Sequence, residues 1–128
     1  MPQFPPEVYD LIAAAITEDQ TFNDPTTQAL VPLEIQGTGI LRAKAHGVLA
    51  GIDVAMEVFR RVDFTLEARV LLVDGAVLNP GDDIAAVSGS ASGILRAERI
   101  ALNFLQPMSG IASGTRAWRI WMASIRSK

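Results

Sequence analysis

The sequence predicts an α+β fold in which helices bracket a β-rich middle. Apolar residues recur at helical spacing in residues 7–18 and 94–105, whereas residues 39–45 and 64–72 alternate apolar and polar side chains. The elements follow the order helix, strand, helix, strands and helix, without the regular strand and helix alternation of a parallel barrel. We therefore expect a mixed or antiparallel sheet packed with helices.

The first helix is expected over residues 7–18, directly after prolines that can begin a helix. Residues 23–27 after it have the sequence Asn-Asp-Pro-Thr-Thr, which is typical of a turn, so we expect a loop there. The helix should pack one face on a sheet. That face carries Val8, Leu11, Ile12, Ala15 and Ile16.

The middle of the chain predicts a strand, a helix and a second strand. The strand of residues 39–45 ends at His46, which we interpret as a turn residue or as part of an interface. The helix begins near Asp53, the expected cap. Residues 64–72 hold the most regular apolar and polar alternation in the chain, and they predict its clearest strand.

Two turns and a third strand come next. Asp74-Gly75 and the Asn-Pro-Gly-Asp sequence of residues 79–82 are turn sequences, and the short apolar run of residues 84–87 lies after the second turn. Ser90 and Ser92 are the candidate caps of the next helix.

The C-terminal region predicts a helix over residues 94–105, a break at residues 107–110, where a proline and a glycine occur, and a last helix. The last helix is inferred from apolar residues at helical spacing. These residues are Trp118, Trp121, Met122 and Ile125.

Composition limits the chemistry. The chain has no cysteine and one histidine, which excludes disulfides, thiol catalysis and a multi-histidine metal site within one chain. Residues 91–128 carry six basic residues and one acidic residue, so this third of the chain attracts anions. Small carboxylates or phosphates fit it better than nucleic acid, because the charges are spread out without interleaved stacking aromatics. No run approaches the roughly 18 apolar residues of a membrane span, and the N-terminus lacks a signal-peptide pattern, so we expect no membrane contact and a cytoplasmic location.

A polar stripe on the helix of residues 94–105 holds the candidate binding residues Arg96, Arg99 and Asn103. Arg99 offers a planar fork of donors that fits a carboxylate bidentately. Spacing alone favours a solvated or structural arginine over a ligand-binding one. The opposite side of this helix carries Ile94, Ala97, Ala101 and Leu105.

Other polar residues give weaker signals. Glu18, Asp19 and Asp24 lie near a helix end and a turn, where carboxylates are usually solvated or capping, and we assign them no catalysis. The glycines form no phosphate-binding loop pattern.

The run from Ala97 to Ser113 reads Ala-Glu-Arg-Ile-Ala-Leu-Asn, Phe-Leu-Gln-Pro-Met and Ser-Gly-Ile-Ala-Ser. It resembles the Ala-Glu-Arg, Ala-Leu-Asn and Ser-Gly-Ile-Ala pattern of the quinolinate phosphoribosyltransferase family, the carboxylating nicotinate-nucleotide pyrophosphorylases of NAD synthesis. Further matches occur in order and at suitable distances, and the resemblance covers residues 7–115. They are Glu18-Asp19, Asp24, Thr26-Thr27, residues 47–51, Val58-Phe59, Asp74-Gly75 and Gly81-Asp82.

The resemblance implies an α/β-hammerhead-like N-terminal domain over residues 1–115. In that family, a homodimer places the N-terminal domain of one subunit over the active site in the phosphoribosyltransferase barrel of the other. The arginine at the position of Arg99 then binds a carboxylate of quinolinate across the dimer. The co-substrate is phosphoribosyl pyrophosphate with Mg²⁺, and the products are nicotinate mononucleotide, CO2 and pyrophosphate.

Residues 116–128 do not resemble the corresponding segment of the family, so we interpret them as a divergent or truncated tail with the catalytic barrel absent. The resemblance then implies a fragment that has no catalytic residue, binds no cofactor with its own residues and is inactive alone. One alternative is another transferase of the superfamily, the molybdenum-transport-associated relative or nicotinate phosphoribosyltransferase. A second is a barrel-sandwich carrier, which needs a lysine at a hairpin tip, whereas Lys44 lies in a strand pattern and Lys128 at the terminus.

Overall fold

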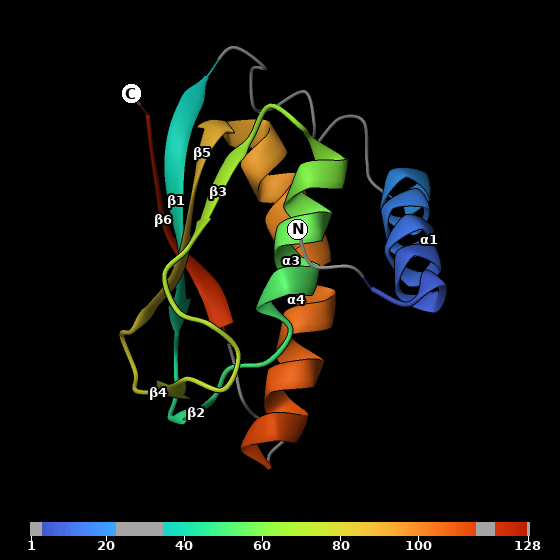
Figure 1. Ribbon diagram of the computed structural model, residues 1–128. Coiled ribbons are helices and arrows are strands. Elements are labelled where there is room, and N and C mark those ends of the chain that lie inside the picture. Colours follow the sequence, from blue (N-terminus) through green and yellow to red (C-terminus); the bar gives the residue numbers. More distant parts are fainter. Residues whose placement is uncertain (1–3, 23–34, 115–119, 128) are drawn as a thin grey trace.

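A computed structural model of the chain describes residues 4–22, 35–114 and 120–127. Helices combine with strands that pair antiparallel, which confirms the predicted α+β class (Figure 1). Among the described residues, no helix is both long and apolar enough to cross a membrane. The elements are α1 (Pro6–Phe22), β1 (Gln36–Ala43), β2 (Gly47–Val48), α3 (Ile52–Val62), β3 (Glu67–Val70), β4 (Val77–Leu78), β5 (Asp83–Ser90), α4 (Ala91–Ser113) and β6 (Ile120–Ser127).

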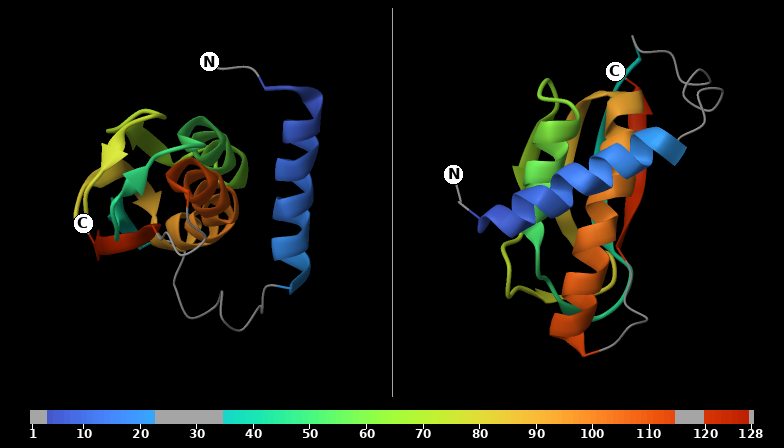
Figure 2. Two further views of the ribbon diagram at one scale, coloured as in Figure 1. Left: turned by 90° about the horizontal axis from the view of Figure 1, so that it is seen from below. Right: turned by 90° about the vertical axis from the view of Figure 1, so that its right-hand side faces the viewer.

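The main sheet has the strand order β3-β5-β1-β6, and its neighbouring strands are antiparallel. β2 and β4 form a separate two-stranded sheet. α3 and α4 lie against each other on one face of the main sheet, and α1 lies on the far side of these two helices (Figure 2). The order of layers is therefore sheet, helix pair and α1.

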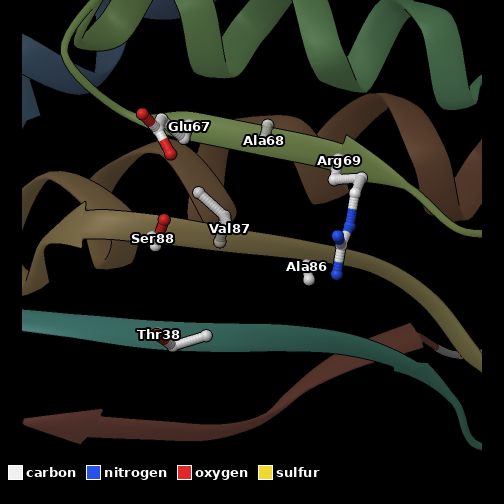
Figure 3. A pocket seen from close by; sticks show the side chains of 7 residues that line it. All are labelled: Thr38, Glu67, Ala68, Arg69, Ala86, Val87 and Ser88. Carbon is white, nitrogen blue, oxygen red and sulfur yellow. The ribbon is translucent and has the colours of Figure 1, made fainter.

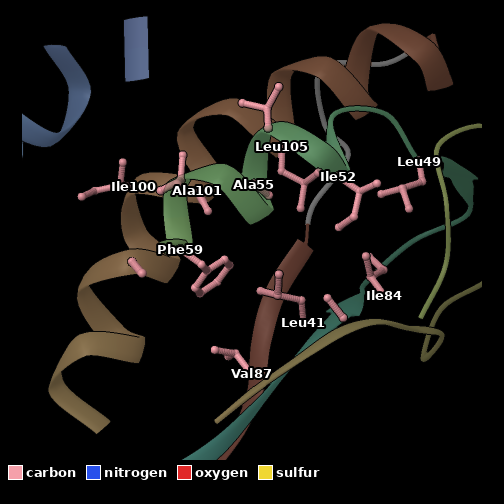
Figure 4. Close-up of a cluster of buried hydrophobic side chains, with 14 of the residues drawn as sticks. Leu41, Leu49, Ile52, Ala55, Phe59, Ile84, Val87, Ile100, Ala101 and Leu105 are labelled. Carbon is pink, nitrogen blue, oxygen red and sulfur yellow. The ribbon is translucent and has the colours of Figure 1, made fainter. Parts of the chain in front are cut away.

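The core lies between the main sheet and the α3/α4 pair (Figure 4). Alternate residues of β1 are buried, among them Leu41 and Ala43, as expected of a strand with one covered face. The predicted apolar side of the last long helix is confirmed, because Ile94, Ala97, Ala101 and Leu105 are fully buried on α4. Other fully buried large side chains are Leu49, Ile52, Phe59, Leu78, Ile84 and Ile100.

α1 confirms the first predicted helix but packs differently from the expectation. It contacts the helix layer instead of a sheet, and its Ile12 is fully buried there. Leu11 was placed on the packed face but is 60% exposed, because the helix buries only a narrow stripe. Val8, Ala15 and Ile16 complete that stripe. The loop predicted for residues 23–27 lies outside the described residues.

The segment predicted as the clearest strand, residues 64–72, forms only the four-residue edge strand β3. The Asp63 carboxylate accepts hydrogen bonds from the backbone N–H and the hydroxyl of Thr65, which makes a turn before the strand. Phe64 is consequently 85% exposed. At the other end, the N–H groups of Leu71 and Leu72 both donate to the carbonyl of Ile84, so regular pairing stops.

Asp53 is not the cap of the second helix. Gly51 occupies that position with φ +95°, and Asp53 lies inside the first turn of α3, where an acidic side chain favours the positive helix end. The carboxylate that satisfies a helix-start N–H comes from the predicted turn at Asp74, which accepts from the N–H of Ile52 at 2.9 Å. The predicted cap was wrong because the carboxylate that accepts from the N–H of Ile52 lies 22 residues further along the chain.

The start of α4 and the glycine turns agree with the sequence. Ser90 caps α4 by accepting a hydrogen bond from the N–H of Gly93. Gly75 and Gly81 have φ near +90°, as turn glycines often do. The predicted strand of residues 84–87 is confirmed as the centre of the longer β5.

The predicted break at residues 107–110 is wrong, because α4 runs through Pro107 to Ser113 and ends at Gly114. Proline removes one helical hydrogen bond. Two serine hydroxyls hold the helix beyond it: Ser109 bonds both the N–H and the carbonyl of Ala50 at 2.9 Å, and Ser113 bonds both groups of Val48. These contacts between distant segments offset the local cost of the proline.

The last predicted helix is also wrong, because residues 120–127 form β6, which pairs with β1 along the edge of the main sheet. The apolar residues of this segment satisfy both a helical and an alternating pattern, so periodicity does not decide between them. The open edge of β1 supplies the pairing partner that selects the strand. Trp118 lies outside the described residues.

Candidate functional site

The candidate site is the polar stripe of α4, on the side that faces α1. Arg99 lies there with its side chain 47% exposed, and Arg96, one turn earlier, is 26% exposed. Asn103, one turn later, is exposed. The structure therefore places the predicted stripe on the surface of α4, with its arginines nearest to α1.

Asp19 of α1 holds Arg99. The guanidinium donates from Nε to Oδ1 of Asp19 at 2.7 Å and from Nη2 to Oδ2 at 3.1 Å, which is a bidentate pair. The Asp19 side chain is only 11% exposed, whereas nearly half of the Arg99 side chain is exposed. This hydrogen bond raises the pKa of Arg99, and burial opposes the rise. The guanidinium is thus charged and partly open to solvent.

Arg96 approaches the same carboxylate without forming a hydrogen bond. Its Nε lies 3.5 Å from Oδ2 of Asp19. The Nε atom is buried, and it has no hydrogen-bond partner within the described part of the chain. One carboxylate therefore lies between two guanidinium groups, so it cannot neutralise both charges.

Glu98 lies between the two arginines in sequence. Burial raises the pKa of its carboxyl group above the ordinary value, and the charge of Arg99 works in the opposite direction. Glu98 is half-buried beside Arg99 on α4, so its carboxyl group is part of the electrostatic environment of the stripe.

Sequence reasoning missed Asp19, which it assigned to solvent or to capping. A signal was present, because Asp19 follows Ile12 and Ile16 at helical spacing and so lies on the buried stripe of α1. A carboxylate on an otherwise apolar stripe requires a cationic partner. Glu18 is exposed, as predicted, and Asp24 lies outside the described residues.

A concave region lies on the main sheet, away from α1 and from the arginine stripe (Figure 3). Its volume is about 500 Å³, and it is an open, shallow pocket over three strands. It carries one acidic and one basic side chain, Glu67 and Arg69, so its charge favours neither an anionic nor a cationic ligand. The lining residues are Thr38, Glu67, Ala68, Arg69, Ala86, Val87 and Ser88.

Metal and histidine chemistry find no support in the described ranges. No group of three or more His, Cys, Asp or Glu side chains there could hold a metal ion. His46 lies in a bend, where its Nδ1 is 3.1 Å from Oδ1 of Asn79, so it is a turn residue.

The fold and the site define a small α+β domain with a partly exposed arginine on the surface of α4. Comparison with known proteins gives its family. The family model described as "Quinolinate phosphoribosyl transferase, N-terminal domain" matches residues 24–109. The chain belongs to this family, as its motifs indicated.

Individual relatives agree with the family match. A nicotinate-nucleotide pyrophosphorylase (carboxylating) of Mycobacterium leprae is 43% identical over 112 residues, covering 85% of this chain and 39% of the relative. A quinolinate phosphoribosyltransferase of Nicotiana tabacum is 38% identical, covering 85% of this chain and 32% of the relative. The crystal structure of NadC from Streptococcus pyogenes superposes with a TM-score of 0.79 at 37% identity, covering 88% of this chain and 40% of that one.

These similarities confirm the predicted family and fold, and they exclude the alternative of a barrel-sandwich carrier. The chain spans between 32% and 40% of the length of these relatives. The structure therefore presents the N-terminal domain of the family, with its arginine stripe on α4.

Proposed function

We propose that this domain belongs to an enzyme that converts quinolinate and phosphoribosyl pyrophosphate to nicotinate mononucleotide, CO2 and pyrophosphate. In this reaction the pyridine nitrogen bonds to the ribose carbon as pyrophosphate leaves, and one carboxyl group leaves as CO2. The domain supplies Arg99, which binds a quinolinate carboxylate in the barrel of a second subunit. A homodimer is therefore part of the proposal.

The observation that carries this proposal is the state of Arg99. It is fixed at one end by Asp19, it remains charged, and its side chain is 47% exposed on the surface of α4. A fixed guanidinium with free donors is suited to bind a carboxylate, because little side-chain entropy remains to be lost. Quinolinate is a dianion, and the charge of Arg96, which shares the Asp19 carboxylate with Arg99, adds to the attraction.

The domain contributes binding and orientation, while we assign the displacement at ribose to the barrel. Phosphoribosyl pyrophosphate and Mg²⁺ bind there in this proposal, and the described residues contribute no metal ligand. Holding quinolinate in place lowers the entropic cost of the bimolecular step. The chain by itself is accordingly proposed to be inactive.

The remaining assignments depend on the family proposal. A boundary at residue 115 is compatible with the end of the family match at residue 109. We keep a cytoplasmic location, although some plant relatives are named as mitochondrial or chloroplastic. We propose no role for nucleic acid or membranes.

The test is a hybrid enzyme in which this domain replaces the matching domain of the Mycobacterium leprae relative. Nicotinate mononucleotide formation gives KM for each substrate. We predict that Arg99→Lys raises KM for quinolinate about five- to 150-fold, because loss of the bidentate fork costs about 1 to 3 kcal/mol. KM for phosphoribosyl pyrophosphate should stay unchanged.

Arg69→Lys is the matched control, since Arg69 is exposed on β3 and belongs to the sheet pocket. It should leave both KM values unchanged. Equal KM values for quinolinate in the Arg99→Lys variant and the parent hybrid would overturn the role of Arg99. The 128-residue chain alone should form no nicotinate mononucleotide. Turnover by this chain would contradict the assignment of the displacement step to the barrel.

A further inference from the structure

We propose that Asp19 is a positioning residue that holds Arg99 by one edge of its guanidinium group and leaves the other edge for a ligand carboxylate. The inference rests on the proposed function, in which Arg99 binds quinolinate. It adds a residue of α1 to the substrate site and defines the orientation in which Arg99 meets its ligand.

The atoms that Asp19 uses define the free edge. A guanidinium has a side edge formed by Nε and one terminal nitrogen, and an end edge formed by both terminal nitrogens. Asp19 occupies the side edge through Nε and Nη2. Among the described residues, no partner binds Nη1 or the second hydrogen of Nη2, and together they form a second bidentate fork for a carboxylate.

The two side chains of the Asp19–Arg99 pair differ in their exposure to solvent. The Asp19 side chain is 11% exposed, whereas the Arg99 side chain is 47% exposed. The pair is therefore enclosed at its Asp19 end and open on the side of the arginine. A ligand from a second subunit can reach the end edge of Arg99 without removing Asp19.

The anchor itself is fixed by packing. Asp19 lies two turns beyond Ile12, which is fully buried, on the same stripe of α1. On the other side, Ser109 ties α4 to Ala50 through two hydrogen bonds. Both ends of the Asp19–Arg99 pair therefore belong to docked elements, and the guanidinium is preorganised before ligand binding.

Because of Arg96, Asp19 does not neutralise the positive charge of the site. The Asp19 carboxylate lies between two guanidinium groups, and the Nε of Arg96 lies 3.5 Å from Oδ2 without a hydrogen bond. Arg96, Arg99 and Asp19 together carry a net positive charge, and the neighbouring Glu98 opposes it when it is ionised. A dianionic ligand is attracted to this cluster even while the Asp19–Arg99 pair stays formed.

The competing interpretation is that Asp19 acts as an internal substitute for the ligand carboxylate, which quinolinate must displace. The two interpretations predict opposite effects of one substitution. Asp19→Asn keeps the size of the side chain and removes its charge. A positioning role predicts weaker quinolinate binding in this variant, whereas displacement predicts tighter binding.

The experiment has two parts. The 128-residue chain with ¹⁵N-labelled arginine is titrated with quinolinate, and NMR follows the Nε–H and Nη signals of Arg99. The hybrid enzyme then gives KM for quinolinate in Asp19→Asn, Arg99→Lys and the double variant. Glu18→Gln, a change of the adjacent exposed carboxylate on α1, is the matched control. The methyl signals of Ile12 report whether α1 remains docked.

We expect quinolinate to shift the Nη signals of Arg99 while its Nε–H signal keeps the position it has when bonded to Asp19. Asp19→Asn should raise KM for quinolinate about tenfold, should leave KM for phosphoribosyl pyrophosphate unchanged, and should add nothing in the Arg99→Lys background. Glu18→Gln should behave as the parent. An unchanged or lower KM for quinolinate in Asp19→Asn would overturn the inference, as would release of the Nε–H signal on quinolinate binding.

The same data separate this inference from the proposed function. If Arg99→Lys raises KM for quinolinate and Asp19→Asn does not, only the positioning role of Asp19 fails. If quinolinate does not shift the Nη signals of Arg99 and Arg99→Lys does not change KM for quinolinate, the proposed function fails and the inference fails with it. If Asp19→Asn raises KM equally in the parent and in Arg99→Lys, Asp19 acts independently of Arg99 and the inference is wrong.

Discussion

At the scale of single residues, the candidate site was half predictable. Arg99 stood out because a family motif surrounded it and because its helical stripe was polar. Asp19 did not, because its partner lies 80 residues away and no local pattern connects the two. Sequence periodicity places a residue on a face of its own helix, but it does not identify the element that packs there.

Gly51 shows a second long-range constraint on a single residue. It has φ +95°, and a Cβ atom at this position would lie 2.7 Å from Sδ of Met108 on α4. The close approach lets β2 and the start of α3 lie against the end of α4. The backbone conformation therefore favours glycine, and a larger residue would also displace the Met108 side chain, which is 39% exposed.

We predict that Gly51→Ala lowers the free energy of unfolding more than Gly75→Ala does. Gly75 has a similar φ of +91°, and a Cβ atom there would have nothing within 4 Å, so it measures the backbone cost alone. That cost is about 1 to 2 kcal/mol. Overpacking against Met108 adds about 1 to 3 kcal/mol for Gly51. Urea denaturation gives both values, and equal losses would show that the contact with Met108 is not tight.

At the scale of elements, the sequence predicted those whose stability is local. α1, α3 and the first part of α4 follow their apolar periodicity, and Ser90 caps α4 as expected. Two predictions failed where a distant partner decides: Pro107 is held inside α4 by contacts to β2 and the residues after it, and β6 is selected by the edge of β1. A third failed for a local reason, because a turn at Asp63 delays the start of β3.

α3 contains a buried carboxylate that gives a test of its own. Glu57 is 5% exposed and accepts hydrogen bonds from Arg60 and Arg61, one turn further along the helix. Burial of Glu57 opposes ionisation, but the hydrogen bonds and charges of both arginines outweigh burial and lower its pKa below the ordinary value of 4.5. The native state therefore binds this proton less readily than the unfolded chain does.

This lowered pKa sets the sign of the pH dependence. The stabilisation by ionised Glu57 is present above pH 4.5 and is lost as the pH falls below that value towards the native pKa. We predict that Glu57→Gln lowers the free energy of unfolding by about 1 to 3 kcal/mol at pH 7, and that the difference from the parent shrinks in acid. Denaturation between neutral and acid pH measures this difference. Glu67→Gln, on exposed β3, is the control and should change the free energy of unfolding at pH 7 little. A constant difference for Glu57→Gln would contradict the assignment.

At the scale of the whole molecule, α1 is an outer layer placed over the arginine stripe. The sheet and the α3/α4 pair enclose the main core, and α1 adds Ile12 and Asp19 on the far side of α4 (Figure 2). Composition and element order were sufficient to predict the α+β class. The position of α1 on the helices was not predictable, because a single amphipathic face fits a sheet and a helix pair equally well.

Docking of α1 can be tested with two neighbouring residues. Ile12→Ala should lower the free energy of unfolding by about 2 to 5 kcal/mol, since Ile12 is fully buried. Leu11→Ala is the matched control, because Leu11 is 60% exposed, and it should change little. If both substitutions have the same small effect, α1 is not docked through Ile12. In that case the Asp19–Arg99 pair would lose its anchor.

The central claim is that Arg99 binds a quinolinate carboxylate across a subunit interface. The most direct measurement is a crystal structure of the hybrid enzyme with quinolinate. We predict a dimer in which Nη1 and Nη2 of Arg99 lie about 3 Å from the oxygens of one quinolinate carboxylate in the other subunit, while Nε stays on Asp19. Quinolinate held by barrel residues alone, with Arg99 directed into solvent, would contradict the account.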